Sequence, residues 1–325
     1  MQADFCWPVL QLTVKYKGYK VFPTRNDNFQ DYFQPAIKTK APWRLLIGII
    51  IILMVYFGFF GVFGVVFVWV AGVDVGPAML EKIIQGSDPL SVILLLTSFA
   101  GLFLGVLAAV RIMHKRGFKS LIGPSWRQAA HNFWIAALCI AILSLGGLLV
   151  ATIFYPPIQP IRQMELFTWL SWMTLGIPLL LVQVSAEELV FRGYFQQQLA
   201  ARFKSRWVWY VLPSALFGLM HYDPETMGSN AWLVVAHTTL FGLIAADITA
   251  RTGNLGAAIG FHFANNLFAL TIVGLDGALS GLGLYKSAIH VSDEAAIRSA
   301  LIPDFIFLII LYGLFMLWAR NRPPW

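Results

Sequence analysis

Residues 43–71 read WRLLIGIIIILMVYFGFFGVFGVVFVWVA, a run in which Arg44 is the only charged side chain. A helix needs about 20 apolar residues to cross a hydrocarbon core about 30 Å thick, and this run is longer. Similar apolar runs recur along the 325-residue chain, of which 58% is hydrophobic and 12% charged. Soluble domains are about half apolar and about a quarter charged. The sequence therefore predicts an all-α, polytopic transmembrane helical bundle.

The apolar runs predict about eight transmembrane spans. Their expected bounds are Trp43 to Ala71, Leu90 to Met113, Phe133 to Tyr155, Phe167 to Ala186, Trp207 to Tyr222, Ala231 to Ala250, Leu255 to Gly274 and Leu301 to Ala319. Lys and Arg concentrate in the N-terminal segment, in every second loop and in the tail. Because cytoplasmic loops are rich in Lys and Arg, this alternation indicates an even number of spans with both termini in the cytoplasm.

The same pattern divides the chain into four segments. These are a cytosolic lead-in at 1–42, accessory transmembrane helices at 43–160, a transmembrane core with the polar motifs at 161–275, and a loop with the last transmembrane helix at 276–325. We expect an integral, multi-pass protein of a prokaryotic plasma membrane with lipids around it. The net charge of +7 comes from the membrane flanks, so nucleic acid is not an expected partner. The sequence does not indicate the oligomeric state.

The first polar motif is Ser185-Ala186-Glu187-Glu188-Leu189-Val190-Phe191-Arg192-Gly193, directly after the largely apolar residues 177–184. An ionised carboxylate at the bilayer centre costs on the order of 3 kcal/mol, so such groups are normally paired and functional. Glu188 and Arg192 are four residues apart and can pair on one helix face. Glu187 lies about 100° round the helix, where it would face elsewhere and be free to act as a base. An ordinary amphipathic helix end at the cytoplasmic surface is the alternative.

Two further motifs end or interrupt apolar runs: Phe217-Gly218-Leu219-Met220-His221 and His262-Phe263-Ala264-Asn265-Asn266. A histidine can transfer a proton near neutral pH or bind a metal. His262 and Asn266 share one helix face and must find polar partners on other helices. The alternatives are an interfacial histidine at position 221 and a structural hydrogen bond between helices at position 262.

Glutamate, histidine and asparagine together supply a base, a second proton-transfer group and an oxyanion donor, as a hydrolytic site requires. The chain has no Gly-x-Ser-x-Gly elbow and no His-Glu-x-x-His motif, so any metal would be held from separate helices. His237 and Asp247 also lie within an apolar run, ten residues apart, and there we expect packing or pore lining. Arg251 is expected to be a cytoplasmic anchor.

The three motifs, in this order and on separate apolar helices, resemble those of the CPBP family. That family comprises the type II CAAX prenyl proteases and bacteriocin-processing relatives. The resemblance covers about Phe167 to Gly274, a third of the chain. It implies an intramembrane endopeptidase in which Glu188 and Arg192 hold the motif helix and the neighbouring glutamate in place.

The resemblance also implies roles for the remaining motif residues. Glu187, assisted by His221, would activate water, and His262 with Asn266 would stabilise the oxyanion. Both glutamate-dependent and metal-dependent hydrolysis are described for the family. A divalent cation such as zinc, held by Glu187, His221 and His262, is therefore a second reading. The substrate would be a peptide bond in a membrane-associated peptide or a prenylated protein with a CAAX-type C-terminus.

Two other classes of function compete with hydrolysis. A proton-coupled transporter also uses buried ionisable groups, but no inverted repeat is visible. A non-catalytic membrane scaffold or immunity protein would more often have lost one of the polar positions. For a hydrolase, Glu187, His221, His262 and Asn266 should converge within about 10 Å. The predicted spans instead place His221 about 21 Å from the edge that holds Glu187, so a tilted or re-entrant segment is needed.

Overall fold

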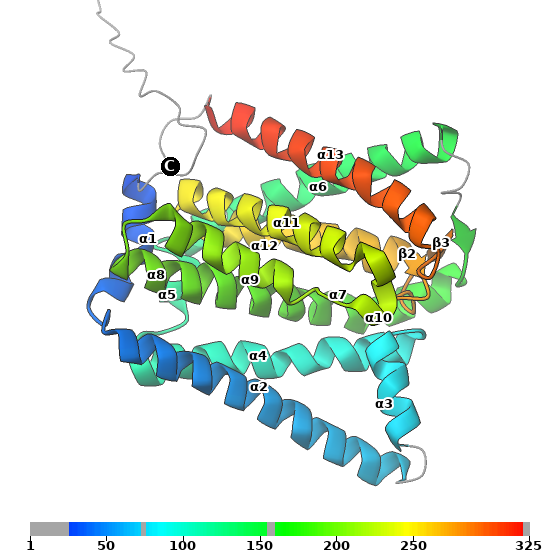
Figure 1. The fold of residues 1–325 in the computed structure, drawn as a ribbon, viewed down its shortest axis with the longest axis horizontal. Helices are drawn as coiled ribbons and strands as arrows, with labels where there is room; N and C mark the ends of the chain where they lie inside the picture. The colour runs from blue at the N-terminus through cyan, green and yellow to red at the C-terminus, as the bar shows by residue number, and fades with distance from the viewer. Residues whose placement is uncertain (1–25, 73–75, 155–159, 321–325) are drawn as a thin grey trace, which may run out of the picture.

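The computed structural model describes residues 26–72, 76–154 and 160–320. Within them, six helices are long and apolar enough to cross a membrane, and two shorter apolar helices cover Trp207–Leu219 and Gly256–Ile272. The predicted all-α polytopic bundle is therefore confirmed. The long helices lie side by side, with α2 and α4 at one side, α6 and α13 at the opposite side and the motif-bearing helices between them (Figure 1).

The elements follow the chain in this order. The α-helices are α1 (Asp27–Ile37), α2 (Pro42–Ala71), α3 (Gly76–Gln85), α4 (Pro89–His114), α5 (Lys119–Ile122), α6 (Trp126–Phe154), α7 (Leu166–Glu188), α8 (Gln196–Arg202), α9 (Leu212–Leu219), α10 (Pro224–Met227), α11 (Ala231–Thr252), α12 (Gly256–Leu267) and α13 (Glu294–Arg320). The remaining helical turns are η2 (Leu189–Phe195), η3 (Trp207–Val211), η4 (Gly228–Asn230) and η5 (Phe268–Ile272). The strands are β1 (Ile161–Arg162), β2 (Val273–Asp276) and β3 (Tyr285–His290).

The helix that carries the glutamates is much longer than predicted. The expected span ended at Ala186, and this end was wrong because the helix continues past Glu187. Here α7, the π-helical η2 and α8 form one helix of 37 residues, Leu166–Arg202. At 1.5 Å per residue it is about 55 Å long, well beyond a hydrocarbon core of about 30 Å. Glu187 consequently lies in the interior of the helix, next to the π-helical turn.

Two glycines set the depth of α12 against α6. An added Cβ at Gly256 would lie 1.8 Å from the carbonyl oxygen of Ala129, and one at Gly260 would lie 2.2 Å from that of Phe133. Small residues four apart let two membrane helices approach this closely. Because His262 follows Gly260 by two residues, this contact also fixes the position of the histidine.

A Gly260→Val substitution is expected to lower the free energy of unfolding by about 1–3 kcal/mol, since the added side chain has no room against the α6 backbone. The matched control is Gly147→Val within α6, where an added Cβ meets no atom within 4 Å. Thermal unfolding of the purified protein in the same detergent compares the two. Equal shifts in the unfolding midpoint would contradict this account of the crossing.

The N-terminal lead-in packs into the bundle through α1. Residues 1–25, which the lead-in includes, lie outside the described residues. Phe29, Tyr32 and Phe33 of α1 are buried, and the Phe29 ring lies 4.7 Å from that of Trp209. The Tyr32 hydroxyl donates to the carbonyl of Leu121 at 2.8 Å. The described part of the lead-in thus belongs to the core at the end where α8 finishes.

The segment between the last two spans contains a strand rather than loop alone. β3 pairs antiparallel with β1 and parallel with β2, which gives a three-stranded sheet in the order β1-β3-β2. β1 immediately precedes α7, and β2 follows α12 through η5. The sheet therefore connects the start of α7 to the end of η5, and so links the two helices that carry the glutamate motif and the His262 motif.

Candidate active site

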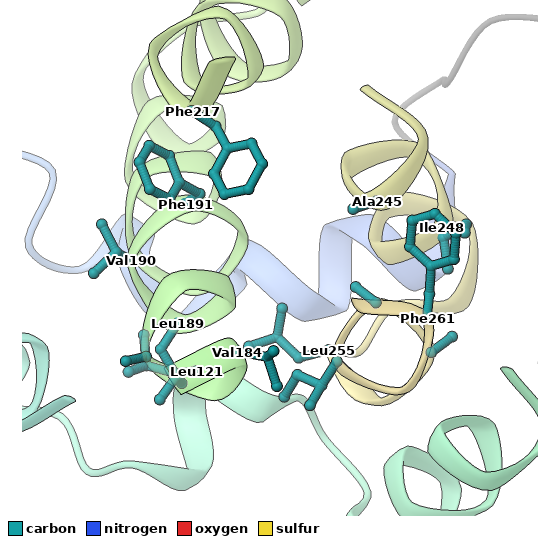
Figure 2. Packing of buried hydrophobic residues seen from close by; sticks show 14 of the residues in the cluster. Leu121, Val184, Leu189, Val190, Phe191, Phe217, Ala245, Ile248, Leu255 and Phe261 are labelled. Carbon is teal, nitrogen blue, oxygen red and sulfur yellow. The ribbon is translucent and has the colours of Figure 1, made fainter. Parts of the chain in front are cut away.

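Glu188 and Arg192 form a buried ion pair on consecutive turns, as their spacing of four predicted. Arg192 Nη1 donates to Glu188 Oε1 at 2.8 Å, and both side chains are almost wholly buried, at 1% and 0% exposure. The Arg192 guanidinium also lies 4.6 Å from the ring centroid of Phe217, a cation–π contact. Figure 2 shows Phe217 beside Phe191 in this part of the core. Arg192 thus joins η2 to α9.

His262 lies between the two glutamates. Its Nδ1 is 2.8 Å from Glu188 Oε1, and its Nε2 is 3.6 Å from Glu187 Oε2. We expected Glu187 to face away from Glu188, but both carboxylates approach the same imidazole ring. Carboxylates about 100° apart on one helix can both reach a ring that approaches between them, and α12 supplies that ring. Glu187 is the more accessible carboxylate, with 13% of its side chain exposed.

Gln183 is a member of the site that the sequence analysis missed. Its Nε2 donates to Glu187 Oε1 at 2.7 Å, and its Oε1 accepts from Asn266 Nδ2 at 3.2 Å. The Asn266 amide nitrogen is also 3.2 Å from His262 Nε2. Gln183 precedes Glu187 by one helical turn, the same spacing that relates Glu188 and Arg192. The signal available in the sequence was a glutamine inside an apolar run, one helical turn before Glu187.

His221 lies beside this cluster rather than within it. Its Nδ1 is 2.9 Å from the carbonyl oxygen of Phe217, which identifies Nδ1 as the donor in this bond. The Phe217 ring lies 4.9 Å from the His221 ring and 6.0 Å from the His262 ring. Among the described residues His221 makes no hydrogen bond or ion pair with Glu187. No direct contact among the described residues therefore supports the predicted assistance of Glu187 by His221.

The structure also explains how His221 comes to lie beside the cluster, despite its predicted separation of about 21 Å from the edge that holds Glu187. Glu187 lies inside a long helix instead of at its end. The segment Trp207–Leu219, which leads to His221, is shorter than a full span, at about 20 Å for its 13 residues. The short helix ends where the Phe217 ring lies 6.0 Å from that of His262, so it brings Phe217 and His221 towards the interior position of Glu187.

The side chains do not fit a bound metal as they are placed. Over residues 26–72, 76–154 and 160–320, no group of three or more His, Cys, Asp or Glu side chains could hold an ion. Glu188 Oε1 already bonds Arg192 and His262, and His221 stands one aromatic ring away. The predicted set of Glu187, His221 and His262 is thus not assembled as ligands.

The other polar residues of the spans attach α13 to α11. Arg251 Nε donates to Asp247 Oδ2 at 2.6 Å, so Arg251 is a partner of Asp247 and not only an anchor. The Tyr312 hydroxyl donates to the same carboxylate. His237 Nε2 lies 2.9 Å from Asp304 Oδ2. These contacts agree with the packing role expected for His237 and Asp247.

Comparison with known proteins finds a family that covers the whole cluster. Residues 167–268 match the family model of the Rce1-like proteins, described as type II CAAX prenyl endopeptidases. An uncharacterized protein, YyaK of Bacillus subtilis (strain 168), is 30% identical over 189 residues. That alignment covers 56% of this chain and 61% of YyaK, so the chain spans less than two thirds of that relative. No solved structure matches the chain.

All six residues predicted for the site lie inside the matched segment. Several helices able to span a membrane support an integral membrane protein, and the family supports a CAAX-type intramembrane protease at the family level. The resemblance stated from the motifs is confirmed: residues 167–268 match the family model of the Rce1-like type II CAAX prenyl endopeptidases.

Proposed function

We propose that the protein is an intramembrane endopeptidase in which Glu187 activates water against a peptide bond. The observation that carries the proposal is the position of His262 between Glu187 and Glu188, with Gln183 and Asn266 bonded to the same groups. Glu188 is wholly buried and bonded to Arg192, whereas Glu187 keeps an exposed edge. Glu187 is therefore the carboxylate that water can reach.

His262 has polar partners on both sides of its ring. Its Nδ1 lies 2.8 Å from Glu188 Oε1, which as a carboxylate oxygen accepts, so Nδ1 is the donor in that bond. Its Nε2 faces Glu187 and the Asn266 amide, where a reacting group would approach.

Hydrolysis would then proceed in two steps. Glu187 accepts a proton from water as the oxygen bonds to the scissile carbonyl carbon, and the carbonyl oxygen becomes an oxyanion. We assign stabilisation of that oxyanion to Asn266 and His262, whose Nδ2 and Nε2 atoms are 3.2 Å apart. Glu187 returns the proton to the amide nitrogen as the C–N bond breaks, which yields a carboxylic acid and an amine.

His221 has a more distant role in this scheme. Its ring lies against Phe217, which also contacts His262 and Arg192. We assign His221 a role in binding substrate or in transferring protons at the edge of the site. The family supports a membrane-associated substrate, and we propose a prenylated CAAX-type C-terminus that approaches from the cytosolic leaflet.

The proposal is tested by cleavage of a quenched-fluorescent farnesylated CAAX peptide with detergent-purified protein. Wild type should cleave it, and His262→Ala should lower the rate by about 10²–10⁴-fold because both the oxyanion donor and the link between the glutamates are lost. A chelator should leave the rate unchanged. Loss of activity with chelator, and its return with zinc, would replace the scheme by the metal-dependent one. Full activity of His262→Ala would overturn it.

Gln183 should act as a positioning residue for Glu187. Gln183→Leu is expected to lower kcat about 10–100-fold with little change in KM, since a misplaced base loses alignment with water. The control is Gln196→Leu, which removes another buried glutamine of the same long helix, bonded to the carbonyl of Ala246. Steady-state kinetics on the peptide separates the two. Equal kcat losses in both variants would reduce Gln183 to a structural role.

A further inference from the structure

A second site, which has apolar walls, lies on the side of α12 away from the glutamates. It is a groove of about 350 Å³ with walls from α6, α11, α12 and α13. Phe261 lines it, whereas the next residue, His262, faces Glu187 and Glu188. Phe261 and Ile248 of the groove wall lie close together in Figure 2. The Phe261 ring stacks on that of Phe241, with ring centroids 4.4 Å apart, and the Phe241 ring lies 5.0 Å from that of His262.

The groove is long enough for one extended chain. Its wall on α6 runs from Asn132 to Leu143, a distance of about 16 Å at 1.5 Å per residue. That is about half of a hydrocarbon core of about 30 Å, the depth of one leaflet. Nearly all of its wall is aliphatic or aromatic. Pockets with apolar walls and few polar groups bind apolar ligands and orient them by those polar groups.

The helices on the two sides of the groove, α6 and α13, are long and apolar enough to cross a membrane, and little of either is buried inside the protein. We therefore expect the groove to open towards lipid. Leu311, Leu314 and Phe315 of α13 form one side of the groove. A hydrocarbon chain can therefore enter from the bilayer without crossing water.

One end of the groove carries an incompletely bonded amide. Asn132 is 2% exposed, and its Nδ2 donates to Asn254 Oδ1 at 3.3 Å. Its Oδ1 has no hydrogen-bond partner among the described residues. A buried amide oxygen without a donor is unfavourable, so a donor from a ligand is expected to stabilise it. Asn132 lies less than two turns from the start of α6 at Trp126, the end expected to face the cytoplasm.

We propose that this groove binds one hydrocarbon chain of a membrane lipid whose head group donates a hydrogen bond to Asn132. The chain lies along α6 towards Leu143, and the donor group sits near the cytoplasmic end. The site is distinct from the peptidase cluster and does not depend on hydrolysis.

The test uses a monoacylglycerol that carries a photoreactive diazirine in its chain, in nanodiscs of phosphatidylcholine with the full-length protein. Mass spectrometry of the irradiated protein should place adducts on the groove residues of α6 and α13. Ala136→Trp fills the groove and should lower these adducts at least about tenfold, because the walls cannot yield to so large a side chain. Leu138→Trp, on the outward face of the same helix at 62% exposure, should leave them unchanged.

A second comparison tests the head group. An analogue with both hydroxyls methylated should compete about fivefold more weakly than the free alcohol, and Asn132→Leu should abolish that difference. Adducts spread evenly over outward positions such as Leu138, or equal competition by both analogues, would mean ordinary lipid solvation and overturn the proposal. The adduct map of the wild type decides the question even where Ala136→Trp does not fold.

Discussion

Glu187→Gln should fold normally and lose hydrolysis of the farnesylated peptide by about a thousandfold. The amide has nearly the same shape as the carboxylate and its oxygen can still accept from Gln183, so the helix should remain in place. What it loses is the capacity to take a proton from water. The initial rate of peptide cleavage, with the unfolding midpoint as a check on the fold, measures the effect.

The control for this substitution is Glu165→Gln. Glu165 directly precedes α7, bonds Arg162 at 3.0 Å and is 82% exposed, so its charge is solvated and remote from the cluster. We expect its cleavage rate to equal that of wild type. If Glu187→Gln kept more than about a tenth of the wild-type rate, general-base catalysis by this residue would be refuted.

The spans could be predicted from the sequence because the bilayer imposes their length. In lipid every backbone group must bond within its own helix, so a long apolar run has one stable structure. The run Trp43 to Ala71 was predicted as a span, and α2 covers Pro42–Ala71. Apolar length also located α4, α6 and α13. The two ends of α4 and the C-terminal ends of α6 and α13 lie within 1 residue of the prediction, whereas α6 and α13 each start 7 residues earlier.

The extension of α7 could not be predicted because its polar residues are buried by distant partners. Gln196, Gln197 and Gln198 are three consecutive polar residues, yet none of the three is exposed. Gln196 Nε2 donates to the carbonyl of Ala246, 50 residues away, and Gln197 accepts from Arg116. Hydropathy records the cost of such groups in lipid but not the tertiary bonds that offset it.

The site was predictable within a helix and not between helices. The spacing of Glu188 and Arg192 indicated their pair directly. Two features depend on the crossing of α7 with α12: both glutamates meet one imidazole, and Gln183 links Glu187 to Asn266. That crossing is set partly by Gly256 and Gly260 against α6, residues that carry no chemistry of their own.

Arg192→Met should be the most destabilising single change in the cluster, lowering the free energy of unfolding by about 3–5 kcal/mol. Methionine retains much of the length of the arginine stem, so little packing is lost. The cost arises because Glu188, wholly buried, then lacks its guanidinium partner. Unfolding in a fixed mixed micelle, followed by circular dichroism, measures it. Arg162→Met breaks an exposed pair, with 51% of the arginine side chain accessible, and should cost about 0–1 kcal/mol.

The double variant Glu188→Gln with Arg192→Met separates charge from packing. The amide oxygen introduced by Glu188→Gln would still accept from His262 Nδ1, and no unpaired carboxylate would stay at that position in the core. Because most of the cost of breaking a buried pair is the charge left behind, the double variant should unfold closer to wild type than Arg192→Met alone. Equal destabilisation of the single and double variants would instead assign the role of Arg192 to its contact with Phe217, 4.6 Å away. In that case the arginine would hold η2 to α9 mainly through the aromatic ring, and the main partner of the Glu188 carboxylate would be His262.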